Sequence, residues 1–179
     1  HHDMIFGDFD GDGKTELVFW NQKVKRLFIA DIPPDAQNSE SWPYTEIYTS
    51  PVQAEGLAKA DIDMDGRIDL VGGGCWFKHV KHNEFASHVI DDEQRLSRVA
   101  VGQLKAGGRP EIVFVIGDGV GHLKWYEWIN GSWAGHDLLG FDVDHGHSLA
   151  VDDINGDGKL DIFCGEMRLN GKNSDAKIW

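Results

Sequence analysis

The sequence contains the acidic stretch GDFDGDGKTELV at residues 7–18. The stretch returns as ADIDMDGRIDLV at residues 60–71 and as DDINGDGKLDIF at residues 152–163, and a degenerate copy, GQLKAGGRPEIV, occupies residues 102–113. The first loop positions of the four copies are residues 8, 61, 103 and 153, so the spacings are 53, 42 and 50 residues. A repeat of this length is typical of one supersecondary unit in an array.

Short apolar runs flank each acidic stretch. A run of small or β-branched residues precedes it, as at 99–101, and a β-branched or aromatic run follows it, as at 112–116. The last strand of a unit is recognisable in parallel at 44–48, 85–90 and 133–139, and no stretch sustains a helical period. Four strands in about 45 residues indicate one propeller blade. We therefore predict an all-β chain, a β-propeller built from four-stranded blades.

The repeats divide the chain into four units, at approximately 1–50, 51–94, 95–142 and 143–179. The last unit ends at 176–179, in what we expect to be its third strand. We expect a partial β-propeller of about four blades, either a fragment of a longer ring or a half that dimerises. Open ends of such an array present unpaired strand edges, so the remaining blades or a second copy are the expected partners there.

Charge and hydropathy exclude two kinds of partner. The 179 residues include 17 basic and 30 acidic residues, a formal net charge of −13, and no basic stripe suited to nucleic acid. No window reaches the roughly 18 apolar residues of a membrane span, and the first residues do not resemble a signal peptide. We expect neither a nucleic-acid partner nor a membrane span, and if the protein is secreted, its leader lies outside this chain.

The three good copies of the acidic loop have the pattern of calcium ligands. Calcium takes about six to eight oxygen ligands, from carboxylates at alternating positions and a main-chain carbonyl. The predicted ligands, with the carbonyl at position seven, are Asp8, Asp10, Asp12, Lys14 and Glu16; Asp61, Asp63, Asp65, Arg67 and Asp69; and Asp153, Asn155, Asp157, Lys159 and Asp161. An EF-hand is excluded because position twelve is Phe19, Gly72 or Cys164 and not glutamate. The alternative to three calcium sites is an Asp/Gly turn without metal.

The degenerate loop lacks most of these ligands. Gln103, Lys105 and Gly107 replace the carboxylates, and only Glu111 is kept. We predict no calcium there. The Lys105 ammonium either takes the place of the ion near Glu111 or is solvated.

The recurring Asp-x-Asp-x-Asp-Gly-x-x-Asp/Glu loop, followed each time by an apolar strand, resembles the FG-GAP or VCBS repeat family. That family includes the integrin α-subunit propeller and many secreted bacterial proteins. The resemblance covers essentially the whole chain. It implies a ring of seven blades, structural calcium at the turn after each innermost strand, and an extracellular or periplasmic location.

A second group of candidates lies six residues before each loop, at His2, Glu55, Ser97 and His147. In a propeller these positions meet in a central funnel, on the face opposite the calcium loops. Two histidines and a carboxylate within 144–147 could hold a second divalent metal or move a proton. We therefore name Glu55, His145, His147 and Glu166 as candidate catalytic residues, and a hydrogen-bonded turn as the alternative for the histidines.

Two classes of function remain open. Secreted propellers that this chain resembles include polysaccharide lyases and a sugar dehydratase, so one hypothesis is a module that binds or processes carbohydrate at the funnel, by β-elimination if it is an enzyme. The other hypothesis is a non-catalytic module that binds a protein or a glycan. The fold does not decide between them.

Overall fold

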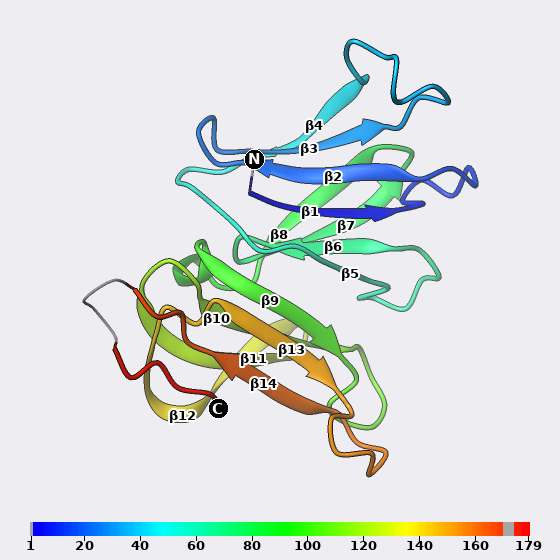
Figure 1. Cartoon of the computed structure of the whole chain (residues 1–179). Coiled ribbons are helices and arrows are strands. Elements are labelled where there is room, and N and C mark those ends of the chain that lie inside the picture. Colours follow the sequence, from blue (N-terminus) through cyan, green and yellow to red (C-terminus); the bar gives the residue numbers. More distant parts are fainter. Residues whose placement is uncertain (1, 170–173) are drawn as a thin grey trace.

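The computed structural model of the chain describes residues 2–169 and 174–179 (Figure 1). The described residues form three four-stranded antiparallel sheets and one two-stranded sheet. The first sheet contains β1 (His2–Gly7), β2 (Glu16–Asn21), β3 (Arg26–Asp31) and β4 (Tyr44–Thr49). The second contains β5 (Ala58–Ala60), β6 (Asp69–Gly72), β7 (Cys75–Lys81) and β8 (Glu84–Val89).

The third sheet contains β9 (Ser97–Gly102), β10 (Glu111–Ile116), β11 (Val120–Ile129) and β12 (Ser132–Asp144), and a short 3-10 helix, η1 (Asp92–Gln94), precedes it. The last sheet pairs β13 (Ser148–Asp152) with β14 (Asp161–Gly165). Beyond β14, Trp179 and Cys164 exchange backbone hydrogen bonds of 2.8 and 3.0 Å. The end of the chain therefore lies where the sequence predicts a third strand, and the prediction of four-stranded units is confirmed for the first three sheets.

The sheets follow one another in chain order, with β1, β5, β9 and β13 as the first strand of each (Figure 1). Three apolar clusters fill the spaces between neighbouring sheets. In β10, Ile112 and Phe114 pack toward the second sheet, while Val113 and Val115 pack toward the last. Because β10 is covered on both faces, Glu111 is followed by the continuous apolar run IVFVI, with no alternation of apolar and polar residues.

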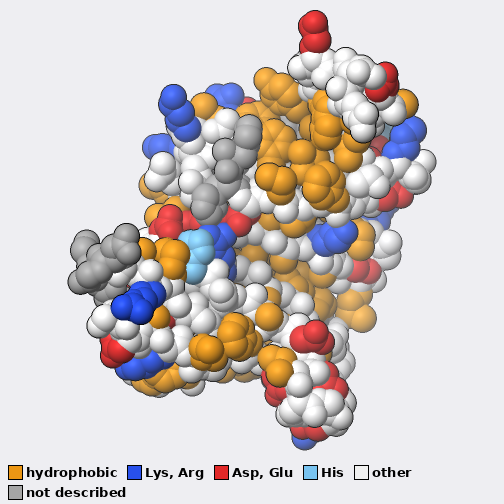
Figure 2. Space-filling model, viewed as in Figure 1, with side chains coloured by type: hydrophobic (Ala, Val, Ile, Leu, Met, Phe, Trp, Pro, Cys, Tyr) orange, Lys and Arg blue, Asp and Glu red, His pale blue; other side chains and the backbone are white. Residues whose placement is uncertain are grey.

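The first sheet is covered on one face only by the described residues. Buried and half-buried residues alternate along β2, with Val18 and Trp20 in the core. On the outward face Phe28 contacts the rings of Phe19 and Tyr44, with ring centroids 5.5 and 5.3 Å apart. Apolar side chains gather over the part of the surface where β1–β4 lie (Figure 2). This face has the apolar character of the inter-sheet surfaces.

The sequence predicts no membrane span, and the helices of the structure bear on this prediction. Among the described residues, no helix has the length and apolar character that crossing a bilayer requires.

Candidate functional site

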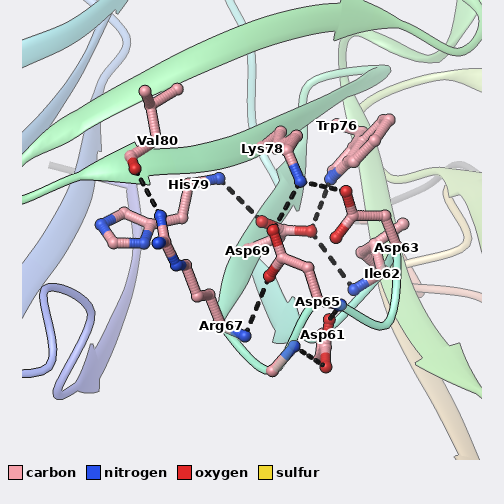
Figure 3. Close-up of polar contacts among 11 residues, drawn as sticks. Asp61, Ile62, Asp63, Asp65, Arg67, Asp69, Trp76, Lys78, His79 and Val80 are labelled. Atoms are coloured by element: carbon pink, nitrogen blue, oxygen red, sulfur yellow. Dashed lines mark hydrogen bonds and ion pairs between the residues drawn. The ribbon is translucent and has the colours of Figure 1, made fainter.

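The acidic loops join the first and second strands of each sheet, and two of them bring three carboxylates together. Asp8, Asp10 and Glu16 form one group, and Asp61, Asp63 and Asp69 form the other. Within each group, one ligand atom per residue lies within 4.8 Å of the others. These residues occupy loop positions one, three and nine, as predicted. The close-up in Figure 3 shows the second group at the start of β6.

Backbone hydrogen bonds to the first aspartate curl each loop. Asp8 accepts the N–H groups of Gly11 and Gly13, at 2.8 and 3.0 Å. Gly13 has φ +84°, a conformation that glycine adopts without the strain of a side chain. The acidic and glycine positions of the sequence therefore specify the loop conformation locally.

The carboxylates at position nine are buried at the base of the loops. Glu16 is 3% exposed and Asp69 is fully buried. Burial raises the pKa of Glu16 and of Asp69 above the usual range, although both accept backbone hydrogen bonds that act in the opposite direction. A cation at the loop would stabilise these buried charges and the neighbouring carboxylates together.

The donor set fits a hard divalent cation. Three convergent carboxylates on a curled, glycine-containing loop are the oxygen ligands that calcium prefers. The two groups could therefore bind cations. Calcium, when bound, would supply electrostatic stabilisation of the turn and no redox or proton chemistry.

The remaining predicted ligands have backbone partners. The carboxylates at position five accept the N–H of the residue at position seven, in the pairs Asp12 with Lys14, Asp65 with Arg67, and Asp157 with Lys159. Asp12 also bonds the Lys14 ammonium at 2.6 Å, and this bond lowers the pKa of Asp12. Neither Asp12 nor Asp65 belongs to the three-carboxylate groups.

The third predicted loop has the same curl but a weaker donor set. Asp153 accepts the N–H groups of Gly156, Asp157 and Gly158 at 2.7–3.0 Å. Position three is Asn155, so the equivalent of the first two groups contains two carboxylates and an amide oxygen. This loop accordingly does not form a three-carboxylate group within the described residues.

The degenerate loop is held by its own side chains. The Gln103 amide donates to the carbonyls of Lys105 and Gly107, at 2.6 and 3.2 Å. Glu111 accepts the N–H groups of Leu104 and Lys105. The Lys105 side chain is 55% exposed and its ammonium pairs with Glu127 of β11, a partner that was not predicted, while the nearby charge of Glu111 also helps to raise the pKa of Lys105. The physical reason is that the backbone occupies Glu111, whereas Glu127 lies across the sheet within reach.

At the opposite end of the sheets, side chains from successive sheets meet at one guanidinium. Arg98 Nη1 lies 2.5 Å from Asp3 Oδ1, and Arg98 Nη2 lies 3.1 Å from Glu55 Oε2 and 2.9 Å from His147 Nε2. Asp118 Oδ1 lies 3.4 Å from the same His147 nitrogen. We call these five residues, Asp3, Glu55, Arg98, Asp118 and His147, the Arg98 cluster. The sequence-predicted positions Glu55 and His147 therefore contact a common group.

The backbone around Glu55 ties the second sheet to the third. Glu55 forms a parallel bridge with Leu96, and its N–H donates to the Arg95 carbonyl at 2.9 Å. The next residue, Gly56, donates its N–H to Asp3 Oδ2 at 2.8 Å. Glu55 is fully buried, whereas the His147 side chain is 29% exposed and that of Asp118 is 48% exposed. The Arg98 cluster therefore has a buried base and an accessible rim.

A pocket borders the rim of the cluster. It has a cavity volume of about 520 Å³ and includes Gln53, Glu93, Leu96, Ile116 and Asp118 in its lining. Asp118 belongs to both the pocket and the cluster. Figure 2 shows a histidine side chain beside basic and acidic side chains on the face in view.

The other predicted site residues have structural contacts. Glu166 accepts the N–H groups of Asp144 and Lys177 with its two oxygens, each at 2.9 Å. His145 Nδ1 lies 2.5 Å from Asp144 Oδ1, so its ring pairs with its own neighbour. Ser97 is buried, with its hydroxyl 2.6 Å from Gln94 Oε1, and the His2 side chain lies outside the described part.

The prediction of a second divalent metal at His145 and His147 is not supported. Neither histidine belongs to the metal-compatible groups of the described residues, and the Arg98 guanidinium lies against His147. A positive group in contact with the imidazole repels a divalent cation.

Arg98 was not among the predicted site residues, because in the third unit the position aligned with Glu55 and His147 is Ser97. Arg98 lies one position beyond Ser97, in β9, and reaches Asp3 of β1 and His147 across neighbouring sheets. The available signal was a basic residue directly after Ser97, one of four aligned positions that also include two histidines and one glutamate.

Successive antiparallel sheets, each opening with a strand and a turn of the same kind, define a repeat protein built from propeller blades. A model of the FG-GAP-like repeat matches residues 8–72, and a model of the FG-GAP repeat matches residues 145–179. No curated protein matches the chain. The chain is therefore a module of FG-GAP and FG-GAP-like repeats, consistent with integrin-α-like β-propeller repeats.

Proposed function

We propose that the chain is part of a calcium-stabilised propeller that binds a neutral, hydroxyl-rich ligand, a carbohydrate, at the Arg98 cluster. The observation that carries the ligand proposal is the meeting of Asp3, Glu55, Arg98 and His147 beside an open pocket. Sugar hydroxyls both donate and accept hydrogen bonds, so carboxylates, a guanidinium and an imidazole suit them together.

Charge favours a neutral ligand over an acidic one. The cluster contains three carboxylates and one guanidinium, and an anionic sugar would meet net repulsion there. The accessible groups are His147 and Asp118 at the rim, whereas Arg98 and Glu55 lie deeper. We assign contact with the ligand to the rim residues and positioning to the buried pair.

The contacts support binding more than sugar processing by a lyase or dehydratase. Glu55 is buried in an ion pair with Arg98, and both oxygens of Glu166 accept backbone hydrogen bonds. A general acid or base needs access to the substrate proton. His147 is the predicted residue that retains partial exposure within the cluster.

Native affinity electrophoresis tests the ligand proposal. The chain is run through gels containing galactomannan or arabinoxylan as neutral probes and pectate as an acidic probe. We expect retardation by a neutral polysaccharide, lost in Asp118→Ala and His147→Ala and kept in Glu84→Ala, a matched control at an exposed carboxylate of β8. Wild-type mobility unchanged in all three gels contradicts carbohydrate binding, and ultraviolet absorbance rising in pectate solutions would establish β-elimination instead.

We propose calcium for the loops because their donor sets suit it. The first and second loops contain three-carboxylate groups, and the third contributes Asn155 in place of one carboxylate. Extracellular modules bind calcium with dissociation constants of about 10⁻⁴ to 10⁻³ M, which suits an extracellular or periplasmic location. Titration calorimetry should find sites that disappear when Asp10 and Asp63 are replaced by Ala, which removes the ligand oxygen.

The outward face of the first sheet is the proposed contact for a further blade. Met4, Phe6 and Tyr44 are 53%, 48% and 66% exposed there. We infer that another blade of a seven-bladed ring, or a second copy of the chain, covers this apolar face. Sedimentation of the chain alone distinguishes self-association from a monomer that needs further blades.

A further inference from the structure

The residue opposite the ninth loop position differs in charge among the first three sheets. In the first sheet the strand register pairs Glu16 with Asp31. Extending the β6–β7 and β10–β11 registers by one residue places Lys78 opposite Asp69, and Glu127 opposite Glu111. The same position in the third strand of each sheet is therefore acidic in the first sheet, basic in the second and acidic in the third.

In the second sheet this position supplies a cation to the acidic loop. Lys78 extends from β7 over the loop, and its ammonium contacts the carboxylates of Asp63 and Asp65, the latter at 2.7 Å (Figure 3). The side chain of Lys78 is 30% exposed and that of Asp63 is 12% exposed. Asp63 is also a member of the three-carboxylate group, so a lysine and a metal ion would use the same ligand.

The third sheet has the same contact with its charges exchanged. There the loop contributes Lys105, and the cross-strand position contributes Glu127. The loop keeps its shape through this ion pair and the hydrogen bonds of Gln103. In the loop that lacks most carboxylate ligands, a charge pair with the third strand therefore helps to hold the loop conformation.

The first sheet has an acid at the cross-strand position. Asp31 accepts a hydrogen bond from Asn83 at 3.2 Å and has the same charge as the loop beside it. The lysine of this loop, Lys14, bonds Asp12, which lies outside the three-carboxylate group. Among the described residues, no lysine forms an ion pair with Asp8, Asp10 or Glu16, and the charge of Lys14 acts on Asp10 without the direct contact that Lys78 makes with Asp63.

We propose that Lys78 is a built-in cation that competes with calcium for the second loop, so that the first loop fills at lower calcium concentration. The inference rests on the calcium binding proposed above. For calcium to coordinate Asp63, the ammonium must give up its ion pairs and leave the site, where it would otherwise repel a divalent ion. We expect the second loop to bind calcium about tenfold more weakly than the first.

The experiment measures calcium affinity loop by loop in the full chain. Calorimetric titration with calcium chloride gives the constants, and the site lost in Asp10→Ala or Asp63→Ala assigns each to a loop. Terbium luminescence excited through tryptophan reports the second loop directly, because Trp76 Nε1 lies 2.9 Å from Asp69 Oδ2. Lys78→Met removes the competing cation, and Lys23→Met, in the exposed β2–β3 turn at the other end of the first sheet, is the charge-matched control.

We expect Lys78→Met to raise the calcium affinity of the second loop about tenfold and to leave the first unchanged, with Lys23→Met like the wild type. The reciprocal change Asp31→Lys should weaken the first loop. Equal effects of Lys78→Met and Lys23→Met, or no effect of Lys78→Met while both loops bind calcium, would overturn the role of Lys78 alone. A wild-type chain that binds no calcium at either loop would overturn the calcium proposal, and this inference with it.

Discussion

Replacing Gly56 with alanine should destabilise the fold far more than the same change at a glycine with open surroundings. Gly56 has φ +77°, and an alanine Cβ there would lie 2.2 Å from the Ser97 carbonyl oxygen. Gly131, in the turn between β11 and β12, has φ +83° and no atom within 4 Å of its hypothetical Cβ. The pair therefore separates backbone strain from the close approach of two sheets.

The magnitude follows from these two effects. A left-handed conformation costs a residue with a side chain about 1–2 kcal/mol, and both variants share this cost. The overlap at Gly56 also forces the segment that leads into β5 away from β9, at about 1–3 kcal/mol. The same shift strains the 3.0 Å hydrogen bond from Trp20 Nε1 to the Gly56 carbonyl. We expect Gly131→Ala to cost about 1–2 kcal/mol and Gly56→Ala about 2–5 kcal/mol.

Urea denaturation followed by circular dichroism measures both values, with the slope of free energy against urea used to check that the denatured state is unchanged. A loss of about 2–5 kcal/mol is a large part of the 5–15 kcal/mol typical of a domain. Equal losses in the two variants would refute the close approach of Gly56 and Ser97. The segment that contains Gly56 would then lie farther from β9 than the structure shows.

Three further predictions concern calcium, acid and thiols. Calcium at about 100 times its dissociation constant should stabilise the fold by about 2.7 kcal/mol for each occupied site, so calorimetry should find the Tm lower by about 5–10 °C per site in excess chelator, and an unchanged Tm contradicts a structural role. Burial raises the pKa of Asp91, but hydrogen bonds from Tyr126, Glu93 N–H and Lys124 lower it more, so the folded state has the lower pKa. The ionised Asp91 therefore stabilises the folded state above about pH 4, and this stabilisation is lost as the pH falls through the folded pKa. Urea midpoints should therefore show that Asp91→Asn destabilises less at pH about 3 than at pH about 7, and equal losses would contradict this assignment. Burial raises the pKa of Cys164 to about 11 and also raises that of Cys75, so a thiol reagent should label both only as fast as the protein unfolds.

Much of the fold followed from the loop repeat. Alternating acids and glycines specify a curled turn through contacts within about nine residues, as in the hydrogen bonds from Gly11 and Gly13 to Asp8. The apolar runs on either side then specify antiparallel strands. Because both signals are local, the four-stranded units and the groups at Asp8 and Asp61 could be predicted from the sequence.

The candidate ligand site could be predicted only in part. Register placed Glu55 and His147 at equivalent points before their loops, and both contact Arg98. The guanidinium itself comes from the next position along β9, and the pairing of His145 with Asp144 depends on side-chain direction. Strand register determines the backbone position of a residue near the site, whereas the length, direction and burial of the side chains determine which groups are in contact.

The sequence by itself determined the repeat, the strand order within each unit and the loops able to hold a cation, because these depend on neighbours within one blade. Only the tertiary structure decided that Glu55 is buried against Arg98, that Lys105 pairs with Glu127 and that Lys78 lies on Asp63. Each of these contacts joins different strands or different sheets. Their partners lie 15 to 43 residues apart in the chain, so pairing depends on packing, and charge alone at either position does not reveal it.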